Sequence, residues 1–163
     1  MGFRNSFRED AFKANVLMGD GVGLSEMKSY FKEVSIRTKG RVEFRNITRD
    51  VVKAVEESGI KSGIVNVFTP HTTTGIFVNE DEGGLKRDLE LILERLIPER
   101  GGYEHDEVDY NAYAHLRSIV LSPSVTIPIE NRRLMLGTWQ SVFLAEFDGP
   151  RERRVRIQVL GMG

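Results

Sequence analysis

Apolar residues recur at every second position in several short stretches of the chain, which is the period of a half-buried β-strand. Tyr30, Val34 and Ile36 follow this period early in the chain, and a last strand follows it over 155–159. Other stretches rich in β-branched and aromatic residues, each bounded by turn residues, predict further strands at 62–68, 75–78, 118–121, 125–129, 134–136 and 141–147.

Two stretches repeat at helical spacing instead. The first runs over 47–58 and stops at Gly59, with Asn46 or Thr48 as its cap. The second opens with Gly83-Gly84 and ends before Pro98. Its apolar residues form one stripe that we interpret as part of the core, namely Leu85, Leu89, Ile92, Leu93 and Leu96.

The predicted order of elements is strand, helix, two strands, helix, a polar loop and then a run of strands. This order predicts an α+β fold in which two main helices cover one side of a largely antiparallel sheet, or of several sheets. A chain of 163 residues with 40% hydrophobic content is long enough for one well-buried core. We therefore expect a single domain over 27–163.

Residues 1–26 differ from the rest of the chain. Their apolar residues recur loosely at helical intervals before a glycine-rich stretch at 19–23, and they are Phe3, Phe7, Phe12, Val16 and Leu17. The pattern predicts a short helix or arm followed by a hinge. We expect this N-terminal extension to pack against another surface, such as a neighbouring subunit.

Charge and composition exclude several classes of function. The formal net charge is -1, so no overall field attracts the chain to nucleic acid or to a membrane. The absence of cysteine excludes disulfides, thiolate metal sites and cysteine nucleophiles. No long apolar run and no basic-then-apolar start is present, so we expect a soluble, cytoplasmic protein. The sequence also lacks the glycine-rich motifs of nucleotide-phosphate loops and the G-x-S-x-G motif of a hydrolase nucleophile elbow.

A polar insert that carries His71 separates two of the predicted strands. Pro70 fixes one backbone torsion just before the histidine, and Thr72 and Thr73 follow with hydroxyls that can donate and accept. Rigid apolar flanks on both sides are typical of a binding or catalytic site. The alternative is a plain polar turn between strands.

All three histidines of the chain, His71, His105 and His115, lie in or beside polar loops. Three imidazoles around one point that leave one coordination position of the metal open are typical of a catalytic zinc-type site. The spacing matches no short ligand pattern, and a histidine alone is more often a surface or capping group. Glu80, Asp106 and Asp109 are further candidates, as ligands, as groups that orient the ligands, or as a general base.

The only tryptophan lies in Gly137-Thr138-Trp139-Gln140. The glycine lets the backbone approach a ligand, and the next three residues offer a hydroxyl, an indole donor and an amide. The alternative is a core tryptophan on a strand behind a glycine bend.

Arginines crowd after the predicted turn at 148–150. Arg151 and Arg153 could clamp a phosphate through their planar guanidinium groups. Arg154 and Arg156 alternate with apolar residues of the last strand, so a solvated strand face explains them equally well. Arg151 and Arg153 are therefore the better phosphate candidates.

Taken in order, several motifs resemble those of the YjbQ-like family, also labelled secondary thiamine-phosphate synthases. The motifs that carry the resemblance are Pro70-His71-Thr72-Thr73, Asn79-Glu80, His105, His115-Leu116-Arg117-Ser118, the segment 122–129, Leu136-Gly137-Thr138-Trp139-Gln140 and Asp148-Gly149-Pro150-Arg151. The resemblance runs from about Met27 to Met162 and does not extend to the first 26 residues. Arg132 departs from it, because the family usually has a glycine after Asn131.

This resemblance implies a sandwich-like α+β domain that assembles as a homotrimer, with its histidines grouped in a pocket that binds metal or anion. It also implies the weak thiamine-phosphate synthase activity of some members. Such chemistry joins a pyrimidine pyrophosphate to a thiazole phosphate and usually relies on Mg²⁺ held by oxygen ligands. Three imidazoles suit zinc or another transition metal better, so a divalent metal is expected, with magnesium as the alternative.

Two functions fit these observations. The first is a metal-dependent enzyme, a transferase, acting on a small phosphorylated or anionic substrate. It would use His71, His105 and His115 as ligands and Glu80 or Asp106 as acid or base. Its substrate-binding groups would be Thr72, Thr73, Asn79, Gly137, Thr138, Trp139, Gln140, Arg151 and Arg153. The second is a non-catalytic trimer that binds a metal or a small metabolite.

Overall fold

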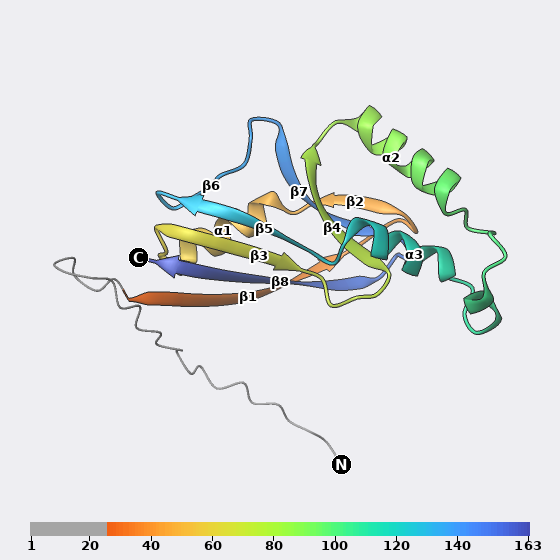
Figure 1. Cartoon of the computed structure of the whole chain (residues 1–163), viewed down its shortest axis with the longest axis horizontal. Coiled ribbons are helices and arrows are strands. Elements are labelled where there is room, and N and C mark those ends of the chain that lie inside the picture. Colours follow the sequence, from red (N-terminus) through yellow and green to blue (C-terminus); the bar gives the residue numbers. More distant parts are fainter. Residues whose placement is uncertain (1–25) are drawn as a thin grey trace, which may run out of the picture.

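The computed structural model describes residues 26–163, so the predicted arm lies outside the described residues apart from its last position. Figure 1 shows the arrangement of the strands and helices. In chain order the elements are β1 (Met27–Arg37), β2 (Glu43–Asn46), α1 (Thr48–Ser58), β3 (Ser62–Phe68), β4 (Thr74–Glu80), α2 (Gly83–Leu96), the 3-10 helix η1 (Glu104–Glu107), α3 (Ala112–Leu121), β5 (Ser124–Glu130), β6 (Arg133–Leu134), β7 (Gln140–Glu146) and β8 (Glu152–Met162).

Within residues 26–163 the strands form two sheets in which every pairing is antiparallel. One sheet has five strands in the order β1-β8-β3-β5-β6, and the other has three in the order β2-β7-β4. Each of the two late strands therefore lies between two earlier ones: β8 between β1 and β3, and β7 between β2 and β4. The predicted α+β fold with largely antiparallel sheets is confirmed.

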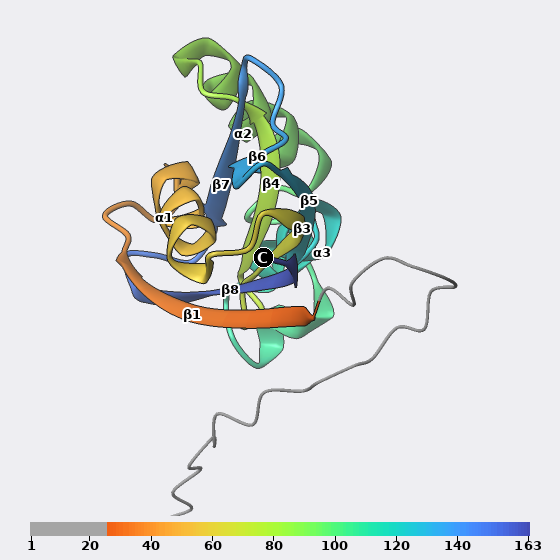
Figure 2. The same cartoon turned by 90° about the vertical axis from the view of Figure 1, so that its left-hand side faces the viewer.

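The main core lies where the two sheets and helix α1 meet (Figure 2). α1 contacts β1, β6 and β8 of the larger sheet and β7 of the smaller one. It buries Val51, Ala54 and Val55 completely or almost completely, which are the positions that a helical apolar face requires. The helix ends as predicted at Gly59, whose left-handed backbone (φ 67°) suits a residue without a Cβ.

Helix α3 replaces the strand that the sequence pattern predicted at 118–121, so that prediction was wrong. The β-branched residues Ile119 and Val120 suggested a strand, but both face solvent, with 74% and 60% of their surface exposed. Ser118 is buried and its Oγ donates a hydrogen bond to the backbone carbonyl of Thr74 at 2.6 Å. This contact holds α3 against the start of β4.

The apolar stripe of α2 is core only in part, contrary to the prediction. Leu93 is buried and Leu89 is half-buried, but Leu85, Ile92 and Leu96 are 38%, 47% and 70% exposed. The helix lies along one side of the smaller sheet, so only part of the stripe meets the protein interior (Figure 1). Even so, no helix within 26–163 is both long enough and apolar enough to cross a membrane.

Candidate functional site

The candidate site residues gather at the two opposite ends of the β4–β7 pair. Thr74 lies opposite Glu146 at one end, next to the insert that carries His71, and Glu80 lies opposite Gln140 at the other. β4 has 7 residues, which corresponds to about 20 Å of strand. A single chain therefore presents two separate places, which we call the histidine end and the groove end.

His71 lies in the turn between β3 and β4 and is held by the last strand. Its Nε2 accepts a hydrogen bond from the backbone N–H of Arg154 at 2.9 Å. Burial and then the nearby guanidinium groups of Arg153 and Arg154 lower the pKa of His71. The imidazole is therefore neutral near pH 7 with its proton on Nδ1, and that nitrogen alone is left for a ligand.

His105 and His115 are brought together although ten positions separate them in the sequence. One comes from η1 and the other from α3, and their ring centroids lie 4.9 Å apart with the ring planes at 76°. Two imidazoles in contact suit a transition metal ion. Within residues 26–163, however, no group of three His, Asp or Glu side chains is placed to hold a metal ion. A metal ion bound by His105 and His115 would therefore need its further ligands from elsewhere.

Asp106 and Asn111 fix the start of α3, one turn before His115. The Asp106 Oδ1 accepts a hydrogen bond from the backbone N–H of Ala112 at 3.1 Å, which satisfies a free donor of the first helical turn. The Asn111 Nδ2 donates to the Asp148 Oδ2 at 3.2 Å, but its buried Oδ1 has no hydrogen-bond partner within residues 26–163. A buried acceptor without a partner is costly, and it marks a place where a donor or a cation would be stabilised.

A buried ion pair that the sequence analysis missed lies beside His71. The Glu146 carboxylate accepts from the Nε and Nη2 of Arg153, both at 2.6 Å, and Arg153 also donates to the Oγ1 of Thr73 at 2.9 Å. Thr38 donates to the same carboxylate at 3.1 Å. Arg153 is therefore engaged inside the protein, and an anion at this arginine would compete with Glu146. A single glutamate in the apolar stretch 141–147 was the signal for this pair.

Arg151 and Thr72 are the more accessible candidates at the histidine end. The Arg151 side chain is exposed, with its Nη2 on the Asp148 Oδ2 at 2.8 Å and its Nε on the Asp148 backbone carbonyl at 2.7 Å. Thr72 is exposed on the turn beside His71. Arg154 and Arg156 lie on the outer strand face with Glu33, as the alternation predicts.

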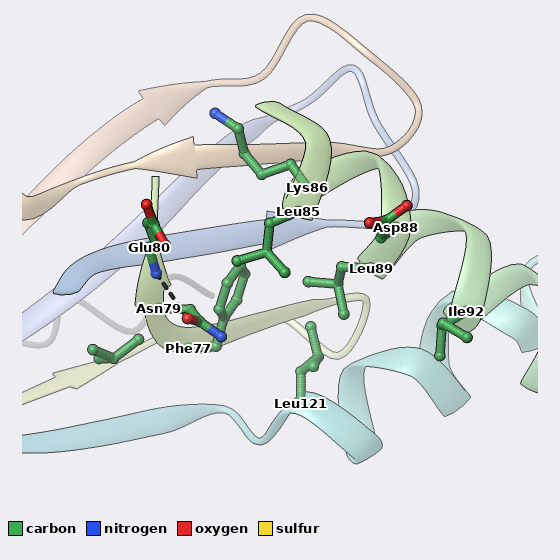
Figure 3. Close-up of a pocket in the computed structure, with 10 residues that line it drawn as sticks. Phe77, Asn79, Glu80, Leu85, Lys86, Asp88, Leu89, Ile92 and Leu121 are labelled. Atoms are coloured by element: carbon green, nitrogen blue, oxygen red, sulfur yellow. Dashed lines mark hydrogen bonds between the residues drawn. The ribbon is translucent and has the colours of Figure 1, made fainter. Parts of the chain in front are cut away.

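The groove end holds a cavity of about 400 Å³ between α2, β4 and the end of α3. Figure 3 shows its apolar floor and its polar rim. The lining residues are Phe77, Val78, Leu85, Leu89, Ile92 and Leu121, with Asn79, Glu80, Lys86 and Asp88 at the rim. Such a lining is typical of a surface that binds an apolar body and one or two polar groups.

The segment Gly137-Thr138-Trp139-Gln140 also lies at the groove end, immediately before β7. Gly137 and Gln140 close a turn in which the Gln140 N–H donates to the Gly137 carbonyl at 3.0 Å. Trp139 is 72% exposed, so the alternative of a core tryptophan is wrong for the single chain. An exposed indole beside polar groups is a common binding element.

Comparison with known proteins places the chain among relatives of similar length. The family model described as "UPF0047 protein YjbQ-like" matches residues 32–162. A UPF0047 protein of Methanothermobacter thermautotrophicus is 47% identical over 83% of this chain and 94% of its own length. The UPF0047 protein YugU of Bacillus subtilis is 37% identical over 80% of this chain and 98% of its own.

Solved structures give the same result. The crystal structure of a YbjQ-like protein of unknown function from Sulfolobus solfataricus matches with a TM-score of 0.81 and 38% identity, over 83% of this chain and 99% of that one. A protein from Aeropyrum pernix, described as hypothetical, matches with a TM-score of 0.78 and 36% identity, over 80% of this chain and 98% of that one. Sequence, fold and the order of the motifs therefore agree that this chain belongs to the YjbQ-like (UPF0047) family.

Proposed function

We propose that this chain is a metal-dependent enzyme acting on a small phosphorylated or anionic substrate, a transferase like the secondary thiamine-phosphate synthases. The contact between His105 and His115 is the observation that carries the proposal. Two imidazoles can hold a divalent transition metal, zinc above all, which would polarise a phosphate oxygen of the substrate. Magnesium, held mainly by substrate oxygens, is the alternative.

The other candidate residues have separate roles in the proposal. Asp106 follows His105 directly and is the acid or base of the histidine end. The Nδ1 of His71 is the ring nitrogen that would contact the ligand, because Nε2 already accepts a hydrogen bond from Arg154. The exposed Thr72 hydroxyl would be a second contact. Arg151 supplies positive charge at the exposed edge. Thr73 and Arg153 support the site from inside through Glu146.

The proposal includes a homotrimer in the cytoplasm. The exposed apolar residues of α2 and α3 favour burial against another copy, since several large side chains on two neighbouring helices are otherwise in water. Glu80, Asn79 and the segment 137–140 are too far along the sheet to reach their own histidine end. They can act on the same ligand only when a second copy supplies them.

Metal binding is the first test. Zn²⁺ and Mg²⁺ are titrated separately into the metal-free chain by calorimetry. We expect His105→Ala and His115→Ala each to weaken zinc binding by at least about tenfold, because each removes one of two protein ligands. Glu107→Ala, on the same exposed 3-10 helix, is the matched control and should bind like the parent. Equal affinity in all four proteins would contradict the proposal.

Turnover is the second test and separates the enzyme from its alternative. A pyrimidine pyrophosphate and a thiazole phosphate are supplied with the preferred metal, and release of pyrophosphate is measured. Release that His115→Ala abolishes and Glu107→Ala retains supports an enzyme. Tight binding of metal or phosphate without turnover favours the non-catalytic trimer instead. The internal engagement of Arg153 is the observation that favours this alternative.

A further inference from the structure

The imidazole of His71 lies where strand β3 would otherwise continue beside β8. β3 pairs with β8 as far as Phe68, which lies opposite Arg156. β8 extends beyond this point, and there the backbone N–H of Arg154 donates to the His71 Nε2 at 2.9 Å. The ring nitrogen therefore replaces a strand carbonyl as the acceptor at the end of the ladder.

The backbone of His71 is fixed as well as its ring. Its carbonyl accepts hydrogen bonds from the Thr74 N–H at 3.4 Å and from the Thr74 Oγ1 at 3.2 Å. The Thr74 Oγ1 also lies 2.5 Å from the Oγ1 of Thr69. Because strand β8 holds the ring and the turn holds the backbone, the orientation of the imidazole is set before any ligand arrives.

The hydrogen bond from Arg154 fixes which ring nitrogen of His71 carries the proton. A backbone N–H only donates, so the Nε2 accepts and the proton of the imidazole lies on Nδ1. A metal ion needs a free lone pair on the nitrogen that binds it. The lone pair of Nε2 faces the strand, and Nδ1 carries a proton in place of one. His71 in this arrangement therefore does not fit a metal ion.

The Nδ1–H of His71 is open to a ligand. In the part of the chain that the structure describes, Nδ1 has no hydrogen-bond partner. The one buried side-chain nitrogen or oxygen without a partner in residues 26–163 is the Oδ1 of Asn111, so the Nδ1 of His71 is not buried. Thr72, the next residue, is exposed on the same turn. The turn therefore offers two accessible donors, a ring N–H and a hydroxyl.

The charged groups around the ring favour an anion as the acceptor. Those that act on the imidazole are the guanidinium groups of Arg153, Arg154 and Arg156 and the carboxylate of Glu146. Arg153 and Glu146 neutralise each other in their ion pair at 2.6 Å. Arg154 and Arg156 share one carboxylate, that of Glu33, at 3.8 Å and 3.1 Å. Positive charge is therefore in excess beside the ring, which is complementary to an oxyanion.

We propose that the Nδ1–H of His71 donates a hydrogen bond to an oxygen of the anionic group of the substrate, a phosphate above all, and that His71 does not bind the metal. This inference rests on the proposed function for the nature of the substrate. It separates two positions at the histidine end: His105 and His115 hold the metal, and His71 holds the phosphate. The exposed hydroxyl of Thr72 is the second donor to the same group.

Phosphate binding is the first test. Inorganic phosphate is titrated by calorimetry into the metal-free, full-length chain. His71→Gln keeps a side-chain carbonyl as acceptor for the Arg154 N–H but removes the Nδ1–H donor, so we expect it to weaken phosphate binding by about tenfold or more. Lys53→Gln, which removes an exposed positive charge on α1, is the control and should bind like the parent. A parent that binds no phosphate, or a His71→Gln variant that binds it equally well, would overturn the inference.

The ring nitrogens give a second readout that a purely structural role would not change. In nitrogen-15 NMR spectra we expect the Nδ1 of His71 to be protonated, its proton signal to move when phosphate is added, and neither nitrogen to show metal coordination when Zn²⁺ is added instead. His71→Gln should also bind zinc like the parent.

The zinc measurements separate this inference from the proposed function. A loss of zinc affinity in His71→Gln of about tenfold, as for a removed metal ligand, would overturn the inference. Unchanged zinc affinity in His105→Ala would instead contradict the proposed metal site and leave the phosphate result for His71 in place.

Discussion

The ion pair between Glu146 and Arg153 is the most deeply buried ionic contact at the histidine end. The Glu146 carboxylate is fully buried and receives the Arg153 guanidinium, the Thr38 hydroxyl and the backbone N–H groups of Phe147 and Asp148. All its partners are donors, so the charge is well compensated inside the protein. Such a pair is costly to break from one side, because the remaining charge stays buried.

Glu146→Gln should therefore lower the free energy of unfolding by about 3–5 kcal/mol, because it leaves the guanidinium of Arg153 buried without a counter-charge. Urea denaturation measures the change. Arg156→Gln is the control, since it breaks only the surface pair with Glu33 and should cost no more than about 1 kcal/mol. A loss in Glu146→Gln as small as that in the control would show that the pair contributes little.

The lowered pKa of His71 makes the histidine end sensitive to acid. Because the pKa is lower in the folded chain than the ordinary value of 6.5, the unfolded chain binds more protons over this range. The stability from neutral His71 is therefore complete at higher pH and is lost as the pH falls below about 6.5. Protonation would also remove the acceptor for the Arg154 N–H.

An NMR titration of the folded chain should give a His71 pKa below 6.5. His71→Gln should flatten the part of the stability curve just below about pH 6.5, because the variant lacks the His71 imidazole. A His71 resonance that titrates at or above the ordinary histidine value would contradict this description of the site.

Helix α2 shows how an element can be predicted correctly while its surroundings are not. Its period, its start and its end follow the sequence pattern, yet four of its leucine and isoleucine positions are exposed in the single chain. A periodic apolar stripe states only that a helix has an apolar side. It does not distinguish an intramolecular core from a surface that another copy covers.

Ile92→Glu tests the proposed trimer at this element. A charge in the middle of the exposed stripe should oppose burial between copies, so sedimentation should show a trimer for the parent and monomers for the variant. Arg87→Glu, at an exposed position of the same helix outside the stripe, is the control and should remain trimeric. A parent that sediments as a monomer, or a variant that stays trimeric, would contradict the assignment of this face.

For the whole molecule, the sequence predicted the fold class, the antiparallel strands and the family, because these depend on local periodicity and on motifs in order. The site was predicted less well. His105 and His115 do meet, but β4 separates Glu80 and Gln140 from His71 by the length of a strand. Sequence patterns carry no distance between elements. The pairing of Glu146 with Arg153 and the open acceptor of Asn111 depend on such distances, which explains why both were missed.

The position of β7 and β8 in their sheets has a consequence for synthesis. Each sheet is built around a strand that leaves the ribosome after both of its neighbours. β1 and β3, and likewise β2 and β4, emerge with no partner between them and cannot form either sheet alone. Long-range pairing of this kind slows folding. The strand edges of the nascent chain therefore stay unpaired and accessible to chaperones until β8 pairs with β1 and β3.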